Sequence, residues 1–119
     1  MVGLFSYPKR KLRKLIKEGE FEEAIALGNS MEEKYQYDPD FIIIMAGIFY
    51  ILQDPKKTLQ YVDRILEINE HDTDALGLKL RVHQHLKENS KVIECCKKIL
   101  EFDSDAYDVR TILNELEGK

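Results

Sequence analysis

The stretch AIALGNSMEEK at residues 24–34 decides the fold, because related segments return at 58–68 (TLQYVDRILEI) and at 92–102 (VIECCKKILEF). A shift of 34 residues aligns all three without a gap. One aligned column holds a large apolar residue in every copy, namely Met31, Ile65 and Ile99. A fixed period of this size in a helical chain is typical of a stacked repeat array, whose units bury their apolar faces against one another. Such arrays usually present a surface and perform no chemistry.

Composition predicts one soluble globular domain spanning residues 1–119, with 44% apolar and 34% charged residues. The longest apolar run, residues 41–52, is too short for a membrane span, which needs about 20 residues. We also expect no cleaved signal, because no long apolar stretch follows the basic residues 9–17. Cys95 and Cys96 are adjacent, which suits neither a disulfide nor a metal clip. Two thiols without a pattern favour a reducing compartment, and we expect a cytoplasmic protein.

Helix start and stop signals divide the chain into seven segments. Asp–Pro pairs at 38–39 and 54–55 each supply an N-cap followed by proline at the first helical position. Gly19 suits the end of the first helix. The expected helices run over about 8–18, 21–35, 39–52, 55–69, 73–87, 89–102 and 105–116, the last opened by Ser104-Asp105. With no sustained alternation of period two, the fold class is all-α.

Three helix pairs at this period resemble the tetratricopeptide repeat (TPR) family. The second unit carries the family pattern best, through Ile42, Met45, Ala46, Phe49, Thr58, Val62 and Ile65. In the first unit, Gly19-Glu20-Phe21-Glu22-Glu23-Ala24-Ile25 looks like the turn between paired helices, and the third unit fits through Leu76, Leu80, Val92, Ile99 and Phe102. The chain departs from the pattern in lacking tryptophan and in placing Gly28 and Cys96 where an aromatic residue is usual. The resemblance implies repeats at about 5–38, 39–72 and 73–104, with a capping helix at 105–117.

The resemblance also implies a right-handed superhelical array whose first helices line a concave groove that binds peptides or partner helices. Carried onto this chain, the groove residues are Lys9, Arg13, Ile16 and Lys17 from the first unit, Ile43, Gly47 and Tyr50 from the second, and Gly77, Arg81, Gln84 and His85 from the third.

One TPR subfamily clamps the C-terminal carboxylate of heat-shock chaperones with lysine, asparagine and arginine side chains. At those positions this chain has Lys9, Arg13, Ile44, Asp74 and Leu78. Asp74 has the wrong sign to hold a carboxylate, and Ile44 cannot donate a hydrogen bond. The chain therefore lacks that clamp.

Charge is distributed unevenly along the chain. Residues 1–17 contain six bases and no acid, whereas the remainder carries a net charge of −10. The basic segment could bind an acidic peptide, nucleic acid or an anionic membrane, or it could be a solvated face. The segment argues against nucleic acid as a partner, because no aromatic residues are interleaved with the bases for stacking. Leu4 and Phe5 permit peripheral membrane contact, although we favour their packing under the first helix.

The run 41–52 is apolar on all sides, which favours a core helix in the middle of the array. His83 and His85 point in different directions on a helix and form a poor metal pair. No catalytic arrangement of side chains is evident, so we expect neither an enzyme nor a cofactor nor a metal. The favoured function is a protein-interaction adaptor whose partner supplies an acidic segment with an apolar anchor. The alternatives are an architectural subunit that associates with itself or within a larger complex, or a peripheral nucleic-acid or membrane adaptor using residues 9–17.

Overall fold

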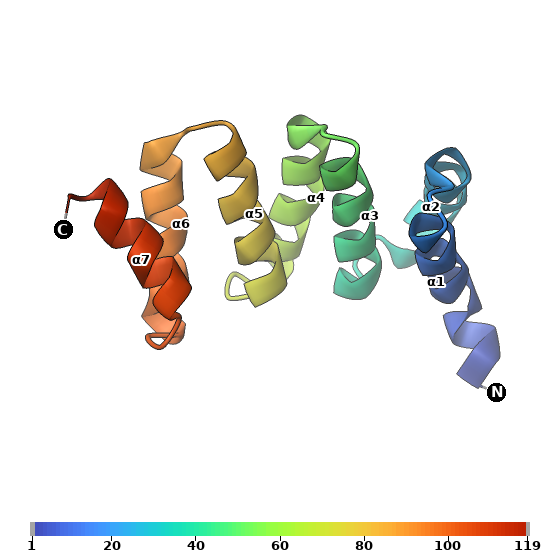
Figure 1. The fold of residues 1–119 in the computed structure, drawn as a ribbon. Helices are drawn as coiled ribbons and strands as arrows, with labels where there is room; N and C mark the ends of the chain where they lie inside the picture. Colours follow the sequence, from blue (N-terminus) through green and yellow to red (C-terminus); the bar gives the residue numbers. More distant parts are fainter. Residues whose placement is uncertain (1, 119) are drawn as a thin grey trace.

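The protein is a row of helices. The computed structural model describes residues 2–118, with side chains from Tyr7 onward, and contains seven helices and no strand over this range. The helices are α1 (Val2–Lys17), α2 (Phe21–Tyr35), α3 (Pro39–Ile51), α4 (Pro55–Ile68), α5 (Thr73–His85), α6 (Asn89–Phe102) and α7 (Tyr107–Leu116). Helices α1/α2, α3/α4 and α5/α6 form three pairs, and α7 packs on α6 (Figure 1). The predicted all-α array of three pairs and a terminal helix is confirmed.

The row is elongated, with extents of 51 × 27 × 21 Å. The pair α1/α2 lies at one end and α7 at the other, so the two chain termini are far apart (Figure 1). Each helix contacts mainly its neighbours in the sequence, as expected for a stacked array.

Aspartate caps fix the starts of three central helices, as the sequence predicts. The Asp38 carboxylate accepts a hydrogen bond from the Asp40 backbone N–H at 2.9 Å. Asp54 accepts one from the Lys57 N–H at 3.1 Å, and Asp72 one from the Ala75 N–H at 2.9 Å. Each cap satisfies a donor that the first helical turn would leave unpaired.

Two helices begin elsewhere than expected. Helix α1 starts at Val2, so that Pro8 lies inside it. Proline suits a first helical turn, but a helix can also pass through it by giving up the one bond to the carbonyl four residues earlier. Helix α7 starts at Tyr107, because residues 104–105 form a turn in which the Ser104 carbonyl accepts a hydrogen bond from Arg110 at 3.0 Å.

The core consists of two apolar clusters. The first joins α1–α4 to the start of α5 and includes Leu12, Phe41, Met45 and Ile65, all with no exposed surface. The second joins α5, α6 and α7, and its outer members are slightly exposed, at 7% for Val109 and 9% for Leu113. The aligned residues of the repeat are all buried, at 4%, 0% and 7% exposure for Met31, Ile65 and Ile99. The 34-residue period therefore marks equivalent interior sites.

Candidate partner-binding groove

The predicted groove residues of α1 lie beside the start of α3. The Lys9 ammonium is 2.9 Å from an Asp38 carboxylate oxygen and 3.3 Å from an Asp40 oxygen. The Arg13 guanidinium donates to both oxygens of Asp40 at 2.7 Å. Carboxylates at the N-terminal end of α3 thus neutralise two of the basic side chains of α1. The other two predicted groove residues of α1 are Ile16, which is half-buried against the first core cluster, and Lys17, which is exposed.

These contacts shift two pKa values. Partial burial alone would raise the pKa of Asp40, but hydrogen bonds from Arg13 and Lys9 outweigh it and hold that pKa below its ordinary value. The pKa of Lys9 is raised, chiefly by its hydrogen bond to Asp38. The ion pairs therefore favour the charged forms on both sides.

The predicted residues of α3 and α5 form the middle and far parts of the same face. Ile43, Gly47 and Tyr50 are half-buried on α3. On α5, Gly77 is half-buried, while Arg81, Gln84 and His85 are exposed. The Tyr50 hydroxyl lies 3.1 Å from Nε2 of His85, and the two rings meet edge to face at 5.8 Å between centroids. This contact joins the second and third units, as the Arg13–Asp40 pair joins the first and second.

Gly47 and Gly77 leave this face open. A Cβ atom built on either glycine would meet no atom within 4 Å. Gly28 differs, because a Cβ there would meet Sδ and Cε of Met45 inside the core. Core packing therefore accounts for Gly28 alone, whereas Gly47 and Gly77 leave the backbone accessible on the side of α3 and α5 where the groove is predicted.

The unpaired positive charges among the predicted groove residues belong to bases other than Lys9 and Arg13. Among the described residues, Arg81 and Lys17 form no ion pair. An anionic group entering the groove would find Arg81 exposed, with Gln84 and His85 on the same face of α5. The free cations among the predicted groove residues thus lie at the C-terminal end of α1, at Lys17, and on α5, at Arg81.

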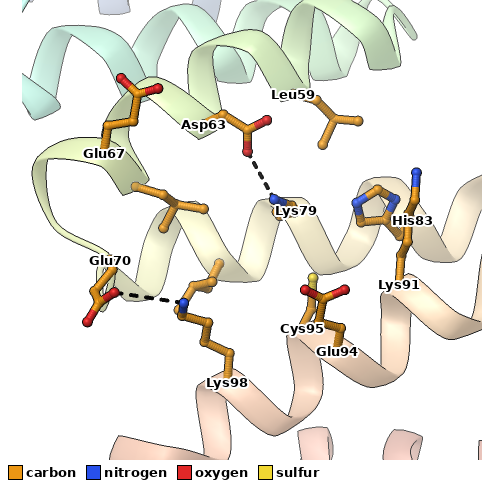
Figure 2. A pocket seen from close by; sticks show the side chains of 12 residues that line it. Leu59, Asp63, Glu67, Glu70, Lys79, His83, Lys91, Glu94, Cys95 and Lys98 are labelled. Atoms are coloured by element: carbon orange, nitrogen blue, oxygen red, sulfur yellow. Dashed lines mark hydrogen bonds and ion pairs between the residues drawn. The ribbon is translucent and has the colours of Figure 1, made fainter.

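Sequence reasoning missed a hollow of about 650 Å³ between α4, α5 and α6. Figure 2 shows its side chains, with the Lys79–Asp63 ion pair (3.0 Å) and the Lys98–Glu70 pair (4.0 Å) at its walls. Helix α5 contributes Leu76, Lys79 and His83, which its turn of about 100° per residue sets on the face away from Gly77 and Arg81. No sequence motif predicts this hollow. It exists because α4 and α6 both contact α5 but not each other.

The remaining chemistry-bearing side chains of the described residues are held in structural contacts. His83 is buried, and its Nδ1 lies 2.9 Å from Glu88, a hydrogen bond that lowers the pKa of that carboxyl. Cys95 and Cys96 are buried free thiols, and desolvation raises the pKa of Cys95 to about 11. Within residues 2–118 no group of three potential metal ligands occurs, and no helix is long and apolar enough to cross a membrane. The side chains of Leu4 and Phe5 lie outside the described part of the chain.

Sequence comparison finds no matching protein-family model and no matching curated protein. Solved structures with a similar fold exist. The first TPR of Spaghetti (RPAP3), solved with the HSP90 peptide SRMEEVD, superposes with a TM-score of 0.80 at 17% identity, over 94% of this chain and 89% of that one. This chain has the TPR fold. The first TPR domain of human RPAP3, solved by NMR, matches with a TM-score of 0.76 at 17% identity, over 93% of this chain and 87% of that one.

Proposed function

We propose that this TPR protein is a non-catalytic interaction module that holds a segment of a partner protein on the face formed by α1, α3 and α5. The observation that carries the proposal is the open space at Gly47 and Gly77. Glycine in a helix interior is destabilising by about 0.5–1 kcal/mol relative to alanine. Two such residues on one exposed face, with no core contact to explain them, fit close approach by a ligand backbone.

The partner segment is expected to combine an apolar anchor with a carboxylate. The anchor would pack beside Ile43 and Ile44, which are only half-buried. The carboxylate would pair with Arg81 or Lys17, because Lys9 and Arg13 already bind Asp38 and Asp40. This assignment moves the electrostatic contact from the centre of α1 toward α5.

The chaperone peptide seen with Spaghetti is not expected to be the partner. SRMEEVD is a peptide from HSP90 bound by that neighbour. Three of the five clamp positions carry Ile44, Asp74 and Leu78, which supply no cation and no hydrogen-bond donor for a terminal carboxylate. The cations at the other two, Lys9 and Arg13, already bind Asp38 and Asp40. Titration with SRMEEVD should give at most weak binding, and it serves as a negative control for the groove.

A peptide-display selection tests the function directly. Random segments of about 12 residues are selected against the full chain, and the enriched peptides are titrated by calorimetry. We expect acidic peptides with a large apolar residue, and we expect Gly47→Gln to weaken their binding at least tenfold by filling the groove. Ala26→Gln is the control, because it creates the same side chain at an exposed position of α2. Peptides that bind both variants equally well would contradict the groove assignment.

The charge of the groove is tested with Arg81→Glu. Opposite charges steer association and mainly raise the on-rate, so the reversal should slow binding of the selected acidic peptides. Added salt should shrink the difference from the parent protein. Lys87→Glu provides a control at an exposed turn position. We further propose a cytoplasmic location, supported by the two free thiols, and no cofactor.

A further inference from the structure

The face of α1 turned away from the groove is basic. Arg10, Lys11 and Lys14 are exposed on α1, and helical geometry turns them about 100°, 160° and 140° away from Lys9. Among the described residues, Arg10 and Lys11 pair with no carboxylate, and Lys14 reaches only Glu18 at 3.9 Å. With Tyr7, the half-buried Leu15 and Glu18, these side chains line a hollow of about 440 Å³. Three bases outnumber the one carboxylate on its walls, and Leu15 gives it an apolar side.

The opposite end of the row carries the opposite charge. Residues 101–118 hold six acids and one arginine, a net charge of −5. Arg110 is turned toward the Ser104 carbonyl. Tyr107, Asp108 and Glu115 lie on the exposed side of α7, away from the buried Val109 and Leu113. Tyr107 is 72% exposed, so its ring is accessible to a partner, as is that of Tyr37 at 77%.

We propose that the outer face of α1 docks on the outer face of α7 of a second copy, so that the protein associates head to tail. The carboxylates of Asp108 and Glu115, about two helical turns apart on α7, are opposite in charge to Arg10, Lys11 and Lys14 on α1. The Tyr107 ring fits the hollow beside Leu15, where surrounding cations favour its π face. Because the two surfaces lie at opposite ends of a row 51 Å long, one molecule cannot satisfy both by itself. A contact between unlike surfaces gives open chains unless its rotation closes a ring.

A second copy is the occupant that the charges favour. It supplies an acidic, aromatic surface of known structure, and it explains both ends of the row together. Nucleic acid would occupy α1 alone, and the net charge of −4 opposes its approach to the rest of the molecule.

Sedimentation of the full chain over a protein concentration series tests the proposal. At low ionic strength the mean mass should rise steadily with concentration, beyond that of a dimer. In about 0.5 M NaCl it should return to that of the monomer, because the Debye length falls to a few Å. A mass that stays monomeric up to about 0.5 mM at low salt would overturn the proposal.

Paired charge reversals separate head-to-tail contact from any symmetric dimer. Lys11→Glu/Lys14→Glu puts two carboxylates on the α1 docking face, and Asp108→Lys/Glu115→Lys puts two cations on the α7 docking face. Each double variant alone should associate at least about tenfold more weakly than the parent. An equimolar mixture should associate again, because opposite charges then meet at every contact. A mixture that stays monomeric, or variants that assemble like the parent, would contradict the model of head-to-tail contact.

Controls keep the result interpretable. Lys56→Glu/Lys87→Glu makes the same charge change at exposed positions in the middle of the row and should leave association unchanged. Circular dichroism melting curves show whether each variant is folded. Duplex DNA and anionic vesicles are titrated in parallel, and binding of either to a chain that remains monomeric would overturn the proposal. These variants leave the groove residues intact, so failure here leaves the proposed groove function standing.

Discussion

At the scale of single residues, the glycines of α2, α3 and α5, which are Gly28, Gly47 and Gly77, have different reasons to be present. Gly28 is buried against Met45, whereas the others face open space. Gly47→Ala should raise the free energy of unfolding by about 0.5–1 kcal/mol through helix propensity alone. Gly28→Ala receives the same propensity gain but must displace Met45, and overpacking costs about 1–3 kcal/mol. Urea denaturation of both variants should rank Gly47→Ala as the more stable. The reverse order would mean that the groove glycines are packed.

A second prediction for a single residue concerns the Asp40 carboxylate and the pH dependence of stability. Its pKa is lower in the folded protein than in the unfolded chain, so its stabilising effect is present above the unfolded pKa of about 4 and is lost as pH falls through the folded value. Asp40→Asn should therefore flatten the loss of stability on acidification below about pH 4. The effect should be small, because Asp40 is 47% exposed. Denaturation midpoints measured from pH 6 to pH 2 test this, with Asp74→Asn as a control on α5. Parallel curves for Asp40→Asn and the parent would contradict it.

At the scale of the helix, α3 separates a core face from a groove face. Phe49 is 6% exposed and stacks on Tyr61 with 5.7 Å between ring centroids. Phe49→Ala should cost about 3–5 kcal/mol, as for other buried aromatic residues. Tyr50→Ala removes a half-buried ring that contacts His85, so it should cost much less while weakening partner binding. Denaturant midpoints that show Tyr50→Ala as the more destabilising change would reverse the assignment of faces.

Helix positions were largely predictable from sequence because local signals set them. Asp38-Pro39 and Asp54-Pro55 mark starts that the structure confirms to the residue. Pro8 misled the prediction for α1, since proline permits a helix start without requiring one. The use of Asp38 and Asp40 to neutralise Lys9 and Arg13 was missed, because it depends on how neighbouring repeats are set against each other. The hollow beside α5 was missed for the same reason.

At the scale of the whole molecule, stability should decrease from the centre of the row toward α7. The first core cluster contains most of the side chains with no exposure, whereas the second is smaller and its outer members are partly exposed. Repeat arrays can open locally, since each unit is held only by its neighbours. Hydrogen exchange should therefore protect amides of α3 most and exchange those of α7 early. Uniform protection along the chain would show that the row unfolds as one cooperative unit.

Changes in amide chemical shifts show which face of the row contacts a bound peptide. A display-selected acidic peptide is titrated into the isotope-labelled protein, and the resolved glycine signals are followed. The groove assignment predicts that the amides of Gly47 and Gly77 shift together and saturate with the bound fraction, while Leu59 and Glu94 beside the hollow of α5 stay in place. Shifts confined to Leu59, Glu94 and their neighbours, with Gly47 and Gly77 unmoved, would contradict it.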